Sequence, residues 1–148
     1  MSRPRGIIFD VDGTLALRNE ADPGVRAWYD WHRVGEDLPN PAVVELAHLL
    51  IAAQSAGGPQ LIVVSGRDEI CRPQTEKWLA QLEIFCAELH MRPHKDNRKD
   101  AIVKREIYER DIAPFWDVRW VVDDRKQVVD MWRDELGLTC FQVAPGDF

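Results

Sequence analysis

Several features that mark other protein classes are missing from this sequence of 148 residues. It has no apolar run near the roughly 20 residues that a membrane-spanning helix needs, and its N-terminus lacks the apolar stretch of a signal peptide. Its three cysteines form no CxxC pair, so we expect free thiols in a reducing compartment. Internal repeats and low-complexity segments are also missing. The sequence therefore predicts a cytoplasmic protein with one domain over residues 1–148.

The sequence also lacks an excess of positive charge. Lys and Arg together number 19 and Asp and Glu number 25, which gives a net charge of −6. A protein that coats nucleic acid needs a strongly basic surface, so that class is excluded. The hydrophobic fraction of 45% and the charged fraction of 30% are those of a soluble globular chain that is long enough to bury a core.

Short apolar segments alternate with amphipathic ones along the chain. Each apolar segment is rich in Val, Ile or Phe, and its continuous apolarity is typical of a strand that is buried on both faces. Apolar residues at helical spacing separate these segments. The alternation predicts an α/β fold, a three-layer Rossmann-like domain with a central, mostly parallel sheet. The expected strands are Gly6–Asp10, Gln60–Ser65, Ala87–Met91, Arg119–Asp123 and Leu138–Val143.

Polar and titratable residues follow three of the expected strands. The carboxyl ends of parallel strands meet at one edge of the sheet, where ligands bind in folds of this class. Packing alone does not require three polar groups at the same edge. The three groups are Asp10-Val11-Asp12, Ser65-Gly66-Arg67 and Asp123-Asp124-Arg125.

The first group lies in the string FDVDGTL. Gly13 allows a tight turn, so that two carboxylates can reach one substrate atom, one as nucleophile and the other as proton donor or acceptor. An EF-hand loop is excluded, because the motif follows a strand and the later calcium-ligand positions hold no acid. A polar turn that caps a helix uses the same residue types, and the motif alone leaves that alternative open.

The other two groups suit phosphate and metal. Ser65, Gly66 and Arg67 offer a hydroxyl, backbone N–H groups and a guanidinium to a phosphoryl oxygen. Asp123 and Asp124 repel each other unless a cation neutralises them, and oxygen ligands favour Mg²⁺. Taken alone, Ser65-Gly66 is also a common turn sequence. Asp123-Asp124 alone could also be an ordinary helix cap.

Lys104 lies four residues after Asp100, which places both on one helical face, where the carboxylate can orient the ammonium. Taken alone, a lysine on a helix is more often exposed to solvent. Only its combination with the other motifs points to a role in a site.

Two further features concern substrate choice. The segment from His90 to Arg105 carries a net charge of +4, so it could hold backbone phosphates or form an ordinary solvated surface. Trp28, Tyr29 and Trp31 follow the first motif and could stack on a base or pack within the protein. The sequence leaves both pairs of alternatives open.

The motifs and their order resemble the haloacid dehalogenase superfamily of phosphotransferases. The strings FDVDGTLA, VVSGR, RKDAIVK, DDRKQVVDMWR and QVAPGDF further resemble the phosphatase domain of phage-type polynucleotide kinase-phosphatases. That domain removes 3′-phosphates from nucleic-acid ends, and the resemblance spans nearly the whole chain. The kinase half of such proteins carries a P-loop, which this sequence lacks, so we do not expect this chain to phosphorylate a substrate.

The resemblance implies a Mg²⁺-dependent 3′-phosphatase that acts through an aspartyl-phosphate. Asp10 would attack phosphorus, and Asp12 would protonate the leaving oxygen and then activate water. Mg²⁺ would lie between Asp10, the backbone carbonyl of Asp12 and the acidic pair. The implied catalytic residues are Asp10, Asp12, Ser65 and Lys104, and the implied metal residues are Asp10, Asp12, Asp123 and Asp124. The implied substrate-binding residues are Thr14, Arg26, Ser65, Gly66, Arg67, Asp100 and Lys104.

The short segment between the first motif and the first long helix leads us to expect a minimal or absent cap domain, which would leave the site open to a polymer end. The expected partners are 3′-phosphorylated nucleic-acid ends and a separate kinase or ligase. We expect no association with a membrane. A small-molecule phosphatase acting on nucleotides is the alternative. A non-catalytic end-binding module is disfavoured, because the motifs that carry the chemistry are intact.

Overall fold

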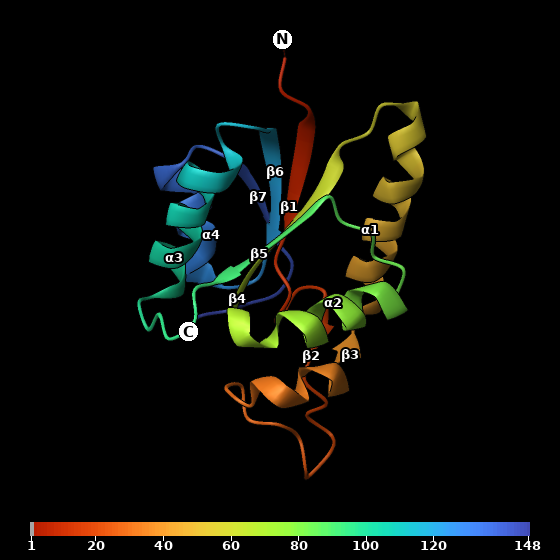
Figure 1. Cartoon of the computed structure of the whole chain (residues 1–148), viewed down its shortest axis with the longest axis vertical. Helices are drawn as coiled ribbons and strands as arrows, with labels where there is room; N and C mark the ends of the chain where they lie inside the picture. The colour runs from red at the N-terminus through yellow and green to blue at the C-terminus, as the bar shows by residue number, and fades with distance from the viewer. Residues whose placement is uncertain (1) are drawn as a thin grey trace.

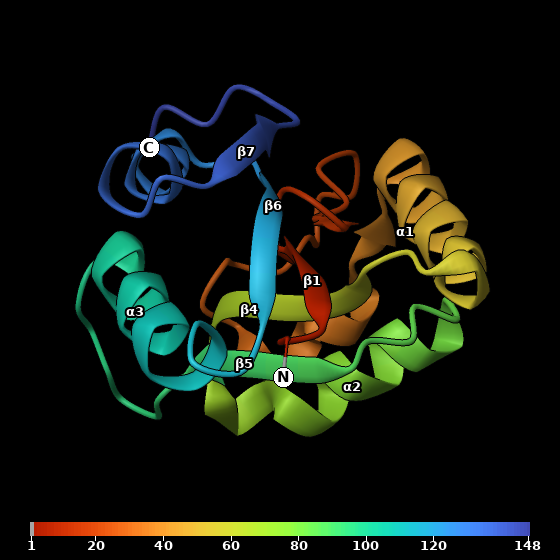
Figure 2. The same ribbon diagram turned by 90° about the horizontal axis from the view of Figure 1, so that it is seen from above.

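The computed structural model describes residues 2–148. Its centre is a five-stranded parallel sheet with helices on both sides, which confirms the expected α/β architecture (Figures 1 and 2). The strands are β1 (Arg5–Phe9), β4 (Gln60–Asp68), β5 (Glu88–Arg92), β6 (Asp117–Asp123) and β7 (Thr139–Gln142). They lie in the order β5-β4-β1-β6-β7.

Two helices cover each face of this sheet (Figure 2). On one face lie α1 (Pro41–Ala53) and α2 (Arg72–Gln81), and on the other lie α3 (Asp100–Ile107) and α4 (Lys126–Asp130). A π-helical turn follows α3 and another follows α4, at Tyr108–Ile112 and Met131–Glu135. Among residues 2–148, the structure has no helix with the length and apolarity to cross a membrane.

Alternate residues of β1 enter two separate hydrophobic clusters. Ile7 and Phe9 belong to the cluster under α1 and α2, whereas Ile8 belongs to the cluster under α3 and α4. Successive side chains of a strand point to opposite faces, and here both faces are covered. This explains why the strand has a continuous apolar sequence.

The segment between β1 and α1 forms a small cap. It contains the antiparallel strands β2 (Ala16–Leu17) and β3 (Leu38–Pro39) and the 3₁₀ helix η1 (Trp31–Glu36). In Figure 1 it lies beyond the carboxyl ends of the strands, below α2. The sequence pattern did not predict these short elements, but their size agrees with the expected minimal cap.

The strand order makes the carboxyl end of β1 a switch point of the sheet. This strand lies between β4 and β6. The chain runs from β1 to β4 and β5 on one side, and then returns to β6 and β7 on the other side. In doubly wound sheets such a switch point is where ligands bind. The three polar groups found in the sequence all lie at this edge.

Candidate functional site

Asp10, directly after β1, forms a buried ion pair with Lys104 of α3. The Lys104 ammonium donates to Asp10 Oδ1 at 2.8 Å and to Asp123 Oδ2 at 3.1 Å, and it lies 3.6 Å from Asp100 Oδ2. Burial opposes the charged form, but Asp10 and the two other carboxylates together raise the pKa of Lys104 well above its ordinary value. Lys104 is therefore a permanent cation inside the site, not a solvent-facing lysine.

Three carboxylates gather beside this lysine. Ligand oxygens of Asp10, Asp123 and Asp124 lie within 4.8 Å of one another, and all three residues are buried. Burial, together with the negative charge of Asp123, raises the pKa of Asp10 well above its ordinary value, and burial also raises that of Asp124. One ammonium does not neutralise three buried carboxylates. The donor set therefore fits a divalent cation that prefers oxygen, as Mg²⁺ does.

The members of this acidic cluster are fixed by different donors. The Thr14 hydroxyl, fully buried, lies 3.1 Å from Asp10 Oδ2 and 3.3 Å from Asp124 Oδ1, and so ties these two acids together. Asp123 Oδ1 accepts the backbone N–H of Asp124 at 2.8 Å, and Asp123 Oδ2 accepts the indole N–H of Trp132 at 3.2 Å. Both Asp123 oxygens thus accept hydrogen bonds from the protein.

Two glycines let the backbone approach these acids. Gly13 has a φ of +82°, and a Cβ at this position would lie 2.1 Å from Asp124 Oδ2. A Cβ at Gly66 would lie 2.2 Å from Asp100 Oδ1. Only glycine has both the conformational freedom and the missing side chain that the turn after β1 requires.

Asp12 is held by two arginines. The Arg67 guanidinium donates to Asp12 through Nε at 3.0 Å and through Nη2 at 2.9 Å, and Arg26 Nη2 lies 3.4 Å from Asp12 Oδ1. The Asp12 side chain is 43% exposed. Burial works against ionisation, but the Arg67 guanidinium outweighs it and lowers the pKa of Asp12. Asp12 is thus an ionised carboxylate in this structure.

The same two arginines share a second carboxylate, that of Asp37. Arg26 donates to both Asp37 oxygens at 2.7 Å each, and Arg67 Nη2 donates to Asp37 Oδ2 at 2.9 Å. Arg67 Nη1 also donates to Thr75 Oγ1 at 3.1 Å. We call Asp12, Arg26, Asp37 and Arg67 the arginine network. The sequence analysis did not identify Asp37, because this residue belongs to no recognisable motif.

The structure shows protein contacts for three of the residues that the resemblance implied as substrate-binding. Arg67 was expected to offer its guanidinium to a phosphoryl oxygen, but it is fully buried and points that group at Asp12. Arg26 is also buried and contacts the same carboxylate. Asp100 lies beside Lys104. Two of the three thus contact Asp12, and the third contacts Lys104.

Ser65 lies at an irregular part of β4. The expected strand was Gln60–Ser65, but pairing with β5 resumes at Asp68 after a register shift. Such bulges re-aim side chains next to functional sites. Ser65 Oγ accepts the backbone N–H of Arg67 at 3.1 Å, which leaves the hydroxyl proton for a phosphoryl oxygen.

The basic segment noted in the sequence is largely ion-paired. Arg98 contacts Asp96 and Glu106 at 2.7 Å each, and Arg105 contacts Glu135 at 2.6 Å. Exposed ion pairs of this kind contribute little to stability. They do, however, engage the two guanidinium groups with carboxylates of the protein. These contacts favour the interpretation as an ordinary solvated surface for this part of the segment.

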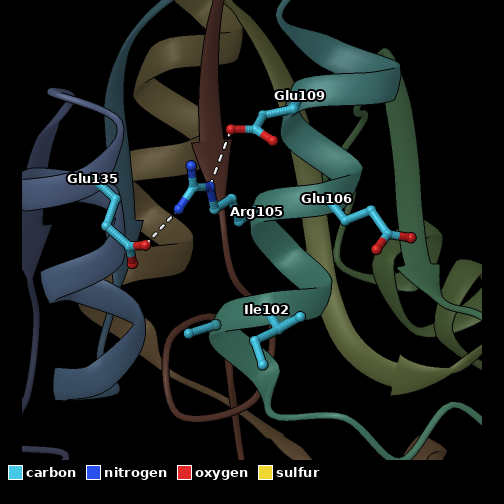
Figure 3. Close-up of a pocket in the computed structure, with 6 residues that line it drawn as sticks. Ile102, Arg105, Glu106, Glu109 and Glu135 are labelled. Atoms are coloured by element: carbon cyan, nitrogen blue, oxygen red, sulfur yellow. Dashed lines mark hydrogen bonds and ion pairs between the residues drawn. The ribbon is translucent and has the colours of Figure 1, made fainter.

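A separate hollow of about 300 Å³ lies on the outer side of α3 (Figure 3). Arg105 crosses it between Glu109, at 3.0 Å, and Glu135. The hollow is lined by solvated ion pairs and a few apolar groups, including Ile102, and it does not contain the carboxylate cluster. The hollow is thus separate from the carboxylate cluster at the sheet edge.

Comparisons with known proteins point to the same chemistry. A family model described as the polynucleotide kinase PNKP phosphatase domain matches residues 4–148. A putative bifunctional polynucleotide kinase/RNA ligase of Autographa californica nuclear polyhedrosis virus is 34% identical over 143 residues, which are 95% of this chain and 20% of that protein.

Two solved structures are similar over almost the whole chain. They are a Pnkp1/Rnl/Hen1 complex, with 43% identity, and a Pnkp1/Rnl/Hen1 RNA repair complex, with 42% identity. Both have a TM-score of 0.86 and cover 99% of this chain, but 48% and 44% of their own chains respectively. The chain thus spans about a fifth of the curated relative and less than half of either solved chain.

Proposed function

Because this chain belongs to the family of polynucleotide kinase PNKP phosphatase domains, we propose that it is a Mg²⁺-dependent phosphatase that removes 3′-phosphates from DNA or RNA ends. The observation that carries the proposal is the buried cluster of Asp10, Lys104, Asp123 and Asp124 at the switch point of the sheet. Residues 1–148 would act as one phosphatase domain in the cytoplasm. The names of the relatives support a kinase or ligase as a partner on the same ends.

In the proposed first step, an Asp10 oxygen attacks phosphorus as the bond from phosphorus to the 3′-oxygen breaks. The product is an aspartyl-phosphate and a free 3′-hydroxyl. Lys104 and Ser65 would hold the other phosphoryl oxygens while negative charge redistributes among them. When held by Asp10, Asp124 and the Asp12 carbonyl, Mg²⁺ would supply the remaining charge neutralisation.

Asp12 must gain a proton before it can protonate the leaving 3′-oxygen, because Arg67 keeps its pKa low in the free protein. A phosphate monoester brings negative charge next to Asp12, and a like charge raises the pKa of a carboxyl. Once the proton is transferred, Arg67 favours the ionised form that remains. Asp12 can then take a proton from the water that hydrolyses the aspartyl-phosphate.

The direct test compares three substrates in the presence and absence of Mg²⁺: a 3′-phosphorylated oligonucleotide, a 3′-mononucleotide and a generic aryl phosphate. We expect kcat/KM for the oligonucleotide to exceed that for the others by at least about tenfold, about 1.4 kcal/mol of transition-state binding. An oligonucleotide phosphorylated at its 5′ end is the matched control and should not be hydrolysed. Equal rates on oligonucleotide and mononucleotide would instead favour the small-molecule phosphatase.

We expect Mg²⁺ to raise the melting temperature more at pH 8 than at pH 5. The pKa values of Asp10 and Asp124 are raised in the fold. Protons on these acids therefore stabilise the metal-free protein fully at pH values below the ordinary carboxyl pKa, and this contribution is lost as the pH rises through the raised values. Mg²⁺ binds the deprotonated form and replaces those protons.

At about 100 times its dissociation constant, Mg²⁺ would add about 2.7 kcal/mol, or roughly 5–10 °C for a protein of this size. Thermal unfolding with MgCl₂ or with EDTA at the two pH values measures the effect. Asp124→Asn is the matched variant and should lose most of the shift. A shift of the same size at both pH values would contradict the placement of the cation among these carboxylates.

A further inference from the structure

Trp28 and Tyr29 form an exposed aromatic pair in the cap. The two residues are 65% and 61% exposed, and their rings meet nearly perpendicularly with centroids 5.5 Å apart. Large aromatic side chains usually bury most of their surface, and adjacent exposed ones mark interaction sites. Of the two alternatives that the sequence left open, this exposure argues against packing for these two residues.

Trp31 has the opposite environment. It packs against the small buried cluster that contains Val34, Cys71 and Met91, and its ring meets that of Trp28 edge to face at 6.0 Å. Trp31 therefore braces Trp28 from the protein side, while most of the Trp28 ring stays open. A ring that is already held in place loses little conformational entropy when a ligand stacks on it.

The backbone at Trp28 is tied to the proposed reaction centre. Arg26 Nη1 donates to the Trp28 carbonyl at 3.0 Å, and Nη2 of the same guanidinium lies 3.4 Å from Asp12 Oδ1. A single guanidinium group thus separates the Trp28 backbone from the carboxylate proposed to protonate the 3′-oxygen. That oxygen belongs to the sugar that carries the terminal base.

We propose that Trp28, braced by Trp31 and flanked by Tyr29, is the stacking platform for the base of the 3′-terminal nucleotide. This inference rests on the proposed function and names part of its substrate recognition. Every base has a face that stacks, so the platform would favour nucleotide ends over smaller phosphomonoesters without reading sequence. It would also let a chain with a net charge of −6 hold nucleic acid through contacts that do not depend on a basic surface.

Two oligonucleotides that differ only at the last residue test this platform. Both carry a 3′-phosphate, but one ends in a normal nucleotide and the other in an abasic sugar. The wild-type protein should have a KM about 5- to 150-fold lower for the end with a base. Trp28→Ala should remove that difference and leave kinetics on the abasic end unchanged, whereas Trp28→Phe should keep most of it.

Phe115→Ala is the matched control. Phe115 is 62% exposed, close to the 65% of Trp28, but it precedes β6 and so lies at the opposite end of the sheet from the site. This variant should leave KM unchanged for both substrates. Melting temperatures of all variants should stay near that of the wild type, since the rings removed are mostly exposed.

The outcomes separate this inference from the proposed function. An equal effect of Trp28→Ala on both ends, or no effect on either, would overturn the stacking role and leave the phosphatase assignment standing. The absence of hydrolysis of either end by the wild-type protein would overturn the proposed function, and the stacking role with it.

Discussion

Asp10→Asn is expected to lower the rate of phosphate hydrolysis by at least about a thousandfold while the protein stays folded. An amide has almost the shape of a carboxylate, but it is a far weaker nucleophile. The local structure should survive, because Lys104 keeps its contacts with Asp123 at 3.1 Å and with Asp100 at 3.6 Å. The loss would therefore fall on the chemical step.

The same substitution should leave the melting temperature of the metal-free protein unchanged or raise it at pH 8. Burial and the charge of Asp123 raise the pKa of Asp10, which means that the ionised form costs folding free energy at this pH. Asparagine removes that charge. We also expect a smaller stabilisation by Mg²⁺, because Asp10 is one of the carboxylates proposed to hold the cation.

Single-turnover release of phosphate from a 3′-phosphorylated oligonucleotide, measured beside thermal unfolding, tests both parts. Asp134→Asn is the matched control, since Asp134 is exposed on the segment after α4. It should change neither measurement. Phosphate release by Asp10→Asn at the wild-type rate would mean that another group attacks phosphorus. A melting temperature that falls together with activity would assign Asp10 a mainly structural role.

The positions of the acidic residues of the site could be predicted from the sequence, because each acid follows a recognisable strand. Asp10 and Asp123 come at the ends of continuous apolar strands, and a parallel sheet brings such ends to one edge. Lys104 needed more than local pattern. Helical spacing linked it to Asp100, but only the resemblance indicated that it would reach Asp10, 94 residues earlier in the chain.

The arginine network could not be predicted in the same way. Its contacts depend on how the cap folds back over β4, and the cap strands contain only two residues each, too few to show a period. Charged side chains are also expected at the surface, so nothing in the sequence indicated that Arg67 is fully buried. The information lies in tertiary contacts between Asp37 and two distant arginines.

Asp37→Ala is expected to produce the largest loss of stability among these variants, about 3–5 kcal/mol. Arg26 and Arg67 are both buried, and each donates to Asp37 at 2.9 Å or less. Without that acceptor, two desolvated guanidinium groups share the single carboxylate of Asp12. Removing one partner from a buried charge network lowers the free energy of unfolding by much more than the intact network contributes to it.

The neighbouring Glu36 provides the control for this prediction. Glu36 also pairs with an arginine, Arg33 at 2.8 Å, but its side chain is 54% exposed. Glu36→Ala therefore removes an ion pair of similar geometry in solvent and should hardly change the free energy of unfolding. Chemical denaturation of both variants gives the comparison. Equal losses of unfolding free energy in the two variants would contradict a stabilising role for the buried network. A large loss confined to Asp37→Ala would show that the burial of this ion pair, and not charge pairing as such, makes Asp37 indispensable.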